Sequence, residues 1–136
     1  MDRAFIKVGD VMSPAPQIID GLASVRQALD IMSEKQLSAL VIERRHEGDE
    51  YAVVNISDIA AKVVSLNPSL ERTSVYEIMT KPALTLSAQM NIKYAVRLLA
   101  RFGLSRALVT KDDQLIGIVS LRDMVVRYVD KVEGAE

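Results

Sequence analysis

The sequence contains no cysteine, no tryptophan and a single histidine, and aromatic residues make up only 4% of it. The lack of cysteine excludes structural disulfides, Cys-ligated zinc, iron–sulfur clusters and thiol nucleophiles. The charges nearly cancel, since 17 Lys and Arg residues face 18 Asp and Glu residues. Because no broad positive field can draw in a phosphate backbone, we expect no sequence-independent binding of nucleic acid.

Long apolar runs and targeting segments are also lacking. The longest apolar runs, such as Ala39–Ile42, contain only a few residues, whereas a membrane-spanning helix needs about 20. Residues 1–7 have no long apolar core, so we expect no secretory signal and no membrane segment, and therefore a cytoplasmic protein. With 136 residues, 49% of them hydrophobic, the chain is long enough to bury a core without metal or disulfides.

Catalytic and metal-binding patterns are sparse. The lone histidine, His46, lies in a charged segment where no neighbour fixes its proton, so we expect neither a general base nor a Ser-His-Asp triad. The acidic pairs 49–50 and 112–113 lack the alternating spacing of a calcium loop, and no glycine-rich phosphate loop is present. We therefore expect no catalytic residue, no metal ligand and no cofactor, and hence a protein that is not an enzyme.

The most informative pattern is an internal repeat. Residues 8–13 (Val-Gly-Asp-Val-Met-Ser) match residues 75–80 (Val-Tyr-Glu-Ile-Met-Thr) at an offset of 67 residues. The same offset relates Ser38 to Ser105, and it falls to 65 residues by the pair Asp58 and Asp123. The two lost residues fall in a polar segment between apolar runs, where a hairpin tip tolerates a length change. The series predicts a duplicated unit.

In each copy, apolar residues alternate between the spacing typical of strands and the spacing typical of helices. The first copy predicts strands at 17–19, 38–42 and 51–54 and helices at 24–35 and 58–66. The second predicts a strand at 83–86, a helix from the N-cap Asn91 to Gly103, a hairpin of 106–110 with 115–119, and a last helix from about Asp123.

This order, β-α-β-β-α twice, predicts an α+β fold. Residues 1–66 form the first repeat, 67–74 a linker and 75–136 the second repeat. Because a lone core of about 65 residues is marginal, we expect the two repeats to pack sheet to sheet with pseudo-two-fold symmetry.

These motifs, in order and twice, resemble a tandem pair of cystathionine-β-synthase (CBS) domains, a Bateman module. The resemblance spans about Val8 to Val129 and is carried by Val-x-x-Val-Met-Ser and Val-x-x-Ile-Met-Thr, by Leu-Ser-Ala-Leu-Val-Ile and Leu-Ser-Arg-Ala-Leu-Val, and by the run at 117–123. It implies a stand-alone regulatory module that binds AMP, ADP, ATP or S-adenosylmethionine in clefts between its halves. It also implies a homodimer without catalytic activity of its own.

The run Gly-x-x-Ser-x-x-Asp at 117–123 suits a nucleoside phosphate on chemical grounds. The carboxylate of Asp123 offers acceptors for both ribose hydroxyls, and the hydroxyl of Ser120 lies on the same rim. The helix that starts here adds backbone N–H groups and a positive dipole end. Gly117 allows a ligand or another backbone to come close. The same Ser-x-x-Asp pattern is also that of an ordinary helix N-cap, so both interpretations stay open.

Cations complete such a site, and Arg106 and Arg122 are the candidates, although solvated arginines have the same pattern. The resemblance implies that Ser105 and Arg106 contact phosphate and that the loop 80–85 lies against adenine. The predicted ligand-binding residues are Asp123, Ser120, Arg122, Arg106, Ser105, Thr80, Leu84, Thr85, Gly117 and Ile118.

The first copy departs from this pattern. Ala52 replaces the glycine, Asn55 replaces the hydroxyl residue, and Ala39 stands where the second copy has Arg106. Asp58 can still accept from a ribose, but the cation is missing. We therefore predict a competent site around Asp123 and a weaker or vacant second one, made of Asp58, Asn55, Ser57, Ser38 and Ser13.

Two functions follow from these patterns. In the first, an adenine-nucleotide sensor changes shape on binding and a separate effector protein reads the change. In the alternative, the repeats serve ligand-independent dimerisation or assembly and the aspartates are helix caps. The apolar faces of the helices at 58–66 and from Asp123 onward fit either a dimer surface or the core of one subunit.

Overall fold

A computed structural model describes residues 5–66 and 68–134. Its α+β fold divides into two compact units. We call Gln17–Ala83 the central unit, and Met1–Pro16 together with Leu84–Glu136 the terminal unit. These units differ from the repeats expected at 1–66 and 75–136. The opening segment of the first repeat, residues 5–16, belongs to the terminal unit with most of the second repeat, and the opening segment of the second repeat, residues 75–83, belongs to the central unit with most of the first.

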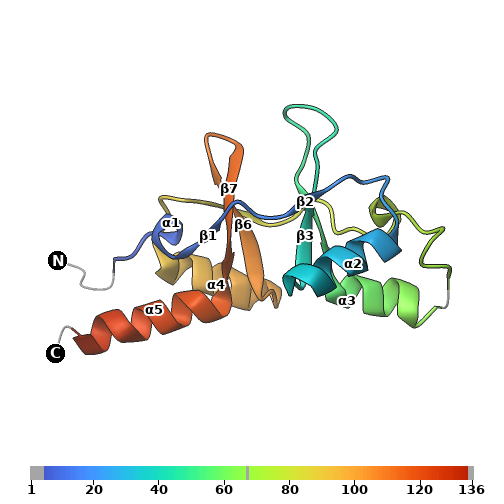
Figure 1. Cartoon of the computed structure of the whole chain (residues 1–136). Coiled ribbons are helices and arrows are strands. Elements are labelled where there is room, and N and C mark those ends of the chain that lie inside the picture. Colours follow the sequence, from blue (N-terminus) through green and yellow to red (C-terminus); the bar gives the residue numbers. More distant parts are fainter. Residues whose placement is uncertain (1–4, 67, 135–136) are drawn as a thin grey trace. The chain divides into compact units, whose positions relative to one another are not determined.

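The central unit contains a three-stranded sheet in the order β2-β3-β4 (Figure 1). Strand β2 runs parallel to β3, and β3 and β4 form an antiparallel hairpin, as the sequence predicts. The bounds are Ile18–Ile19 for β2, Ala39–Ile42 for β3, Ala52–Asn55 for β4, Val25–Lys35 for α2, Ile56–Ile59 for α3, Ala60–Val64 for a π-helical continuation of α3 and Val75–Glu77 for a 3-10 turn.

Helix α2 forms where the sequence predicts it because its ends and its apolar face agree. Ser24 Oγ accepts from Gln27 N at 3.1 Å, and Ser24 N donates to Gln27 Oε1 at 2.8 Å, which makes a capping box. Val25, Ala28 and Met32, one helical face, are buried in the core of this unit. The predicted helix at 58–66 begins two residues earlier, at Ile56, because β4 ends at Asn55.

The segment expected to be the linker is built into the central unit where the structure describes it. Val25 N donates to Thr73 O at 2.8 Å, and Val75 N donates to Ala23 O at 2.8 Å. Arg26 N donates to Leu70 O at 3.1 Å. The bonds to Thr73 and Leu70 satisfy two N–H groups of the first turn of α2 that a helix cannot pair internally.

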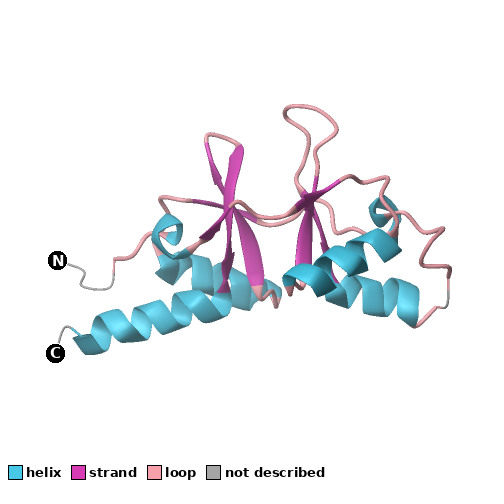
Figure 2. Ribbon diagram, in the orientation of Figure 1, coloured by secondary structure: helices cyan, strands magenta, loops and turns pink. Residues whose placement is uncertain are grey.

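The terminal unit contains a four-stranded sheet in the order β1-β7-β6-β5, and α5 packs beside α4 (Figures 1 and 2). Asn91 Oδ1 caps α4 by accepting from Lys93 N at 3.0 Å, and Gly103 ends that helix with φ 64°, both as predicted. The bounds are Val8–Val11 for α1, Ser13–Pro14 for β1, Thr85–Ser87 for β5, Ile92–Phe102 for α4, Arg106–Lys111 for β6, Gln114–Ser120 for β7 and Leu121–Gly134 for α5.

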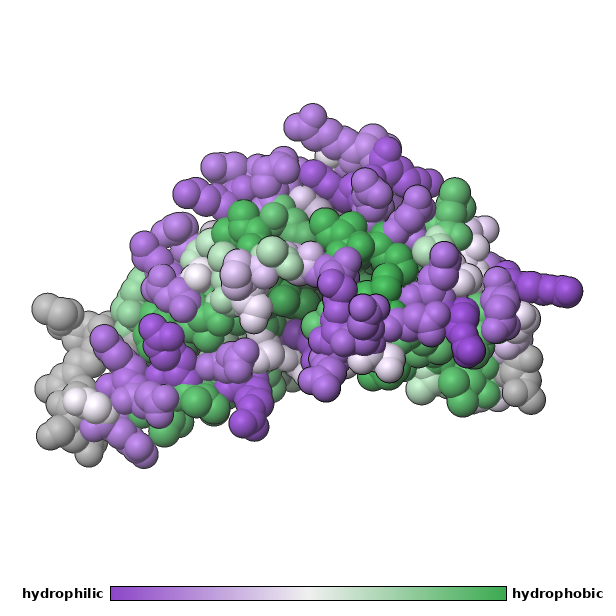
Figure 3. Space-filling view, in the orientation of Figure 1, coloured by the Kyte–Doolittle hydropathy of each residue, from purple (hydrophilic) through white to green (hydrophobic). Residues whose placement is uncertain are grey.

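The β6–β7 hairpin confirms the predicted turn at 111–114. Asp112 and Asp113 both have positive φ, 51° and 64°, and Lys111 pairs with Gln114. Two left-handed residues between paired strands make a tight two-residue turn. Figure 3 shows hydrophilic side chains (purple) over the tips of the hairpins.

The opening segment of the first repeat is an integral part of the terminal unit. Val8 N donates to Met90 O at 2.8 Å, and Ile92 N donates to Ile6 O at 2.8 Å. Val8 is completely buried. Strand β1 then pairs with β7, with Ser13 opposite Ile118. Neither α1 nor β1 follows from the sequence patterns, because both are too short to show a period.

The opening segment of the second repeat mirrors this arrangement in the central unit. Thr80 N donates to Val53 O at 2.8 Å, and Val53 N donates to Thr80 O at 3.1 Å. Ala83 N donates to Tyr51 O at 2.8 Å. Residues 80–83 thus run along the free edge of β4 as β1 runs along β7, which supports the duplication.

Gly117 is required by this strand pairing. A Cβ at position 117 would lie 2.8 Å from Ser13 O and would collide with the side chain of Met12. The sequence leaves open whether Gly117 makes room for a ligand or for another backbone. The structure places the backbone of Ser13 next to it. None of the helices in the described ranges is long and apolar enough to cross a membrane.

We predict that Gly117→Ala lowers the free energy of unfolding by about 1–3 kcal/mol, because the added methyl forces β1 away from β7. The change is measured by urea denaturation at neutral pH. Gly134→Ala is the matched control, since nothing lies within 4 Å of a Cβ there. Its effect should be a stabilisation of at most about 1 kcal/mol. Equal stability of the Gly117→Ala variant and the original chain would contradict this account of β1.

Candidate functional site

The junction of β7 and α5 holds the principal predicted residues. Ser120 Oγ accepts from Asp123 N at 3.0 Å, and Ser105 O accepts from Leu121 N at 2.8 Å. Ser120 therefore is the helix cap that one interpretation of the sequence proposed. Two N–H groups of the first turn are used by the protein itself, so fewer remain for an anion than the sequence suggests. The hydroxyl hydrogen of Ser120 is still available, because Oγ acts only as an acceptor in this bond.

Asp123 presents an open carboxylate in the first turn of α5. Its side chain is exposed and makes no hydrogen bond or ion pair with any residue of the described ranges. The carboxylate lies in the first turn of the 14-residue helix, where the positive end of the helix dipole attracts an anion. Both carboxylate oxygens can therefore accept from a pair of neighbouring hydroxyl groups.

Cationic side chains lie close to this junction in the fold. Arg106, the first residue of β6, is the cross-strand partner of Ser120 and is half-buried. Arg122 follows Leu121 on α5 and is exposed. Within the described ranges, neither guanidinium group forms an ion pair or a hydrogen bond. The fold thus places an unpaired carboxylate, a hydroxyl group and the half-buried Arg106 around the end of β7 and the start of β6.

The remaining predicted residues of the terminal unit serve mainly the sheet. Gly117 and Ile118 lie within β7, where they pair with β1. Leu84 O accepts from Leu108 N at 3.0 Å, and the Leu84 side chain packs on the core of this unit. Thr85 begins β5 with an exposed side chain.

Thr80 and Ser13 each lie in the compact unit that does not contain the aspartate with which the sequence groups them. The sequence grouped Thr80 with Asp123, but Thr80 belongs to the central unit, where its Oγ1 donates to the carboxylate of Asp58 at 3.2 and 3.3 Å. The sequence grouped Ser13 with Asp58, but Ser13 belongs to the terminal unit, beside Ile118. The physical reason is the exchange of the opening segments, which the order of the repeats along the chain does not reveal.

Asp58 differs from Asp123 because donors of the protein surround it. Asn55 N donates to Asp58 Oδ2 at 2.9 Å, and Asn55 Nδ2 lies 3.3 Å from the same oxygen. Lys62 Nζ lies 3.8 Å from Asp58 Oδ1, and the Asp58 side chain is only 14% exposed. With Thr80 as a further donor, the carboxylate has little acceptor capacity left. The side-chain amide of Asn55 is thus engaged with Asp58.

The surroundings of Asp58 repeat those of Asp123 without the cation. Ala39 is the cross-strand partner of Asn55, as Arg106 is of Ser120. Ser38 O accepts from Ile56 N at 2.9 Å, which is the role of Ser105 in the terminal unit. Ser57 is an exposed residue of α3.

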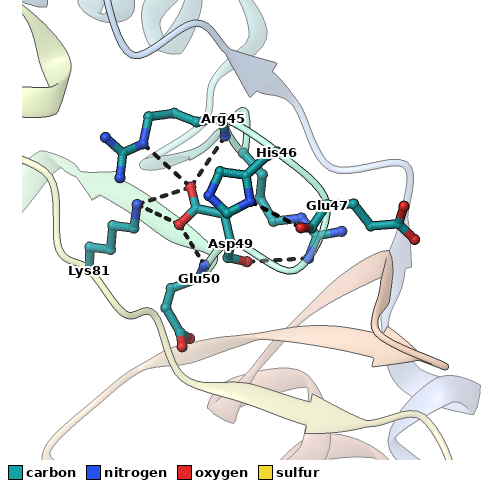
Figure 4. Close-up of polar contacts among 7 residues, drawn as sticks. Arg45, His46, Glu47, Asp49, Glu50 and Lys81 are labelled. Carbon is teal, nitrogen blue, oxygen red and sulfur yellow. Dashed lines mark hydrogen bonds and ion pairs between the residues drawn. The ribbon is translucent and has the colours of Figure 1, made fainter.

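Asp49 anchors an ion cluster on the β3–β4 hairpin that the sequence did not reveal (Figure 4). Lys81 Nζ lies 3.1 Å from each carboxylate oxygen, and Arg45 Nε lies 3.6 Å from Oδ2. Arg45 N and Glu50 N donate to the same carboxylate at 3.2 and 2.9 Å. The hydrogen bond from Lys81 holds the pKa of Asp49 well below its ordinary value, against the opposing effect of burial, and the two backbone N–H groups add to the lowering.

His46 is exposed on the same hairpin, as predicted, with its ring Nδ1 3.0 Å from Glu47 O. Among the residues that the structure describes, no group of three or more His, Asp or Glu side chains could hold a metal ion.

The comparisons with known proteins agree with the repeated fold. The family model described as CBS domain matches residues 8–65 and again residues 75–130. A hexameric CBS-CP12 protein from bloom-forming cyanobacteria is 34% identical, with a TM-score of 0.86 over 96% of this chain and 75% of that one. The structure of CBSX2 in complex with AMP is 26% identical, with a TM-score of 0.74 over 91% of this chain and 96% of that one.

A curated relative is longer than this chain. An uncharacterized 33.4 kDa protein in a ribosomal RNA operon of Thermofilum pendens is 26% identical over 96% of this chain but only 46% of its own length. The chain thus spans about half the length of the curated relatives it matches.

The two aspartates should differ in their contributions to stability. We expect Asp58→Ala to lower the free energy of unfolding by about 2 kcal/mol, because it removes a cap and leaves several donors without an acceptor. Asp123→Ala should cost about 0.5 kcal/mol, since only the helix-dipole interaction is lost. Urea denaturation of both variants tests the contrast. Equal losses would mean that Asp123 has a structural partner as well.

Asp49 should make stability depend on pH in the acid range. Because its folded-state pKa lies below its unfolded-state value of about 3.9, the pair with Lys81 stabilises the fold fully above that value and progressively less as the pH falls below it. Urea denaturation between pH 2.5 and pH 7 should show a steeper acid-side loss for the original chain than for Asp49→Asn. Superimposable pH profiles would rule out this role, and Glu47→Gln, on the same hairpin, is the control.

Proposed function

This chain belongs to the CBS-domain family, with one domain at 8–65 and a second at 75–130, and we propose that it is a regulatory module that senses an adenine nucleotide. The nucleotide binds at the start of α5 in the terminal unit. The module has no catalytic role of its own, and a separate effector protein reads the ligand-dependent change.

The observation that carries this proposal is the difference between the two equivalent aspartates. Asp58 is surrounded by donors of the protein, whereas the Asp123 carboxylate has no partner among the described residues. An exposed, unpaired acid that contributes little to the fold is available for a ligand. The equivalent Asp58 of the first copy, whose oxygens already accept from Asn55 and Thr80, supports this contrast.

The chemistry around Asp123 fits a nucleoside phosphate. Two carboxylate oxygens accept from the 2′- and 3′-hydroxyl groups of a ribose, as acidic residues do in other nucleotide sites. The Ser120 hydroxyl group donates its remaining hydrogen to an anionic oxygen, and Arg106 neutralises the phosphate charge. The half-buried Arg106 loses less freedom on binding than a fully exposed arginine, so it is the stronger of the two candidate cations.

The comparison with CBSX2 supports AMP as the ligand to test first, since a related fold at 26% identity holds AMP. The sulfonium compound S-adenosylmethionine, ADP and ATP share the ribose and adenine and form the remainder of the series.

Self-association is the second candidate function, supported by an apolar face on α5. Val125, Val126 and Val129 are 44%, 48% and 41% exposed, and hydrophobic side chains (green) line the lower edge of α5 in Figure 3. The CBS-CP12 relative is hexameric. We propose a homodimer in which this face is covered. Dimerisation is compatible with nucleotide sensing, and it becomes the whole function only if no nucleotide binds.

We predict saturable binding of AMP in calorimetric titration, and a loss of affinity of at least about tenfold in Asp123→Asn. The substitution keeps the size of the side chain but replaces one of the two acceptor oxygens with a donor, which leaves a ribose hydroxyl unpaired. ADP, ATP and S-adenosylmethionine are titrated in the same way.

The matched control is Asp58→Asn, the same substitution at the equivalent position, which should leave the affinity within about twofold. Absence of heat with all four compounds would leave the assembly function in place of the sensor. Equal weakening by both substitutions would mean that the nucleotide does not discriminate between the two aspartates, against the proposed site.

A further inference from the structure

The central unit has a pocket of about 700 Å³, and of the predicted ligand-binding residues and the loop 80–85 only Lys81 of that loop lines it. This volume lies within the range of small-molecule sites. Three segments enclose it: residues 20–22 before α2, the base of the β3–β4 hairpin, and residues 76–81. All of its lining belongs to the central unit, so it is a different place from the junction that holds Asp123.

The cations of the pocket are already engaged. Lys81 and Arg45 contact the carboxylate of Asp49, whose side chain is 9% exposed. The Arg44 guanidinium lies 4.3 Å from the centre of the Tyr51 ring and donates to Asp49 O at 3.2 Å. An anionic ligand would have to displace Asp49, which five contacts hold, before it could use these charges.

The carboxylates at the wall of the pocket are, in contrast, available. Glu43 and Glu50 both line the pocket, both are exposed, and neither side chain has a partner among residues 5–66 and 68–134. Figure 4 shows the Glu50 carboxylate turned away from Lys81 and Asp49. Asp20 adds a third carboxylate, of which one oxygen accepts from Leu22 N at 2.8 Å.

The rest of the lining is apolar. Ile42 and Ala52 are buried beneath the pocket, while Leu22 and Tyr76 are 77% and 52% exposed at its wall. Met79 is half-buried. Large apolar side chains next to unpaired carboxylates fit a ligand that has a flat apolar body and a positive charge, since an aromatic face also attracts a cation.

We propose that this pocket is a second ligand site, for a small organic cation with a flat apolar body. The ammonium group pairs with Glu43 and Glu50, and the body packs against Leu22 and Tyr76. The pocket does not suit a nucleoside phosphate, because its carboxylates are unpaired and its cations are already engaged.

The pocket is linked to Asp58 through three consecutive residues. Met79 and Lys81 line the pocket, and Thr80 between them donates to Asp58. Neighbouring side chains of an extended segment point to opposite sides, which explains this division. A ligand that moves Met79 or Lys81 therefore changes the surroundings of Thr80, whose amide is paired to β4.

Tryptamine is a suitable probe, because it joins an indole ring to a primary ammonium group. In two-dimensional NMR titrations of the full chain, its addition should shift amide signals of pocket residues and of Thr80, with a dissociation constant of about 1 mM or lower for this ligand of about 12 non-hydrogen atoms. The double variant Glu43→Gln, Glu50→Gln should bind at least fivefold more weakly. Glu47→Gln, on the same hairpin but outside the lining, should bind as the original chain does.

Three results would overturn the proposal: no saturable shift at the pocket, equal affinity of the double variant, or equal affinity for tryptophol, which has a neutral hydroxyl in place of the ammonium group. Shifts at the same residues with inorganic phosphate but not with tryptamine would assign the pocket to an anion instead. AMP is titrated in parallel. Its shifts are expected around Asp123. The tests of the pocket and of the adenine site are therefore independent, because each is followed at different residues.

Discussion

The exchange of the opening segments between the two repeats is the constraint on which the candidate site depends. Main-chain pairing of Thr80 with Val53, and of Ser13 with Ile118, decides which side chains share a unit. Backbone N–H and C=O groups must be paired when they are buried, so these short segments occupy edges that the strands β4 and β7 would otherwise leave open. The pairing brings the Thr80 hydroxyl group to Asp58, and it also explains the glycine at position 117.

The two equivalent aspartates show how a duplicated site acquires two roles. Both lie at the third position of a helix that follows a strand, and both have a basic residue four positions later, Lys62 and Arg127. Lys62 lies 3.8 Å from Asp58, whereas Arg127 makes no ion pair with a described residue. At 3.8 Å the Lys62 ammonium group is beyond hydrogen-bond distance, so the decisive donors are Asn55 and Thr80. In the terminal unit, Ser120 Oγ caps the helix by accepting from Asp123 N, and no donor of a described residue contacts the Asp123 carboxylate.

Much of this arrangement follows from local sequence patterns, and the remainder does not. The Ser24 and Asn91 caps, the Gly103 terminus and the 111–114 turn are local signals, so the helices and the hairpin could be predicted. The duplication also indicated Asp58, Asp123 and the cation difference at Ala39. The partners of β1 and of Thr80 could not be found, because main-chain pairing leaves no pattern in side chains. The Asp49–Lys81 pair joins residues 32 positions apart, and neither residue departs from an ordinary surface pattern.

The difference in hairpin length between the repeats bears directly on what each unit can bind. The β6–β7 hairpin closes with a two-residue turn at Asp112 and Asp113. The β3–β4 hairpin has a longer loop, and this loop supplies Asp49 and the cations around it. The carboxylate of Asp49 then fixes Lys81 and with it the segment that carries Thr80. The longer loop therefore forms a wall of the pocket on one side of residues 79–81. On the other side, the Thr80 hydroxyl group donates to Asp58.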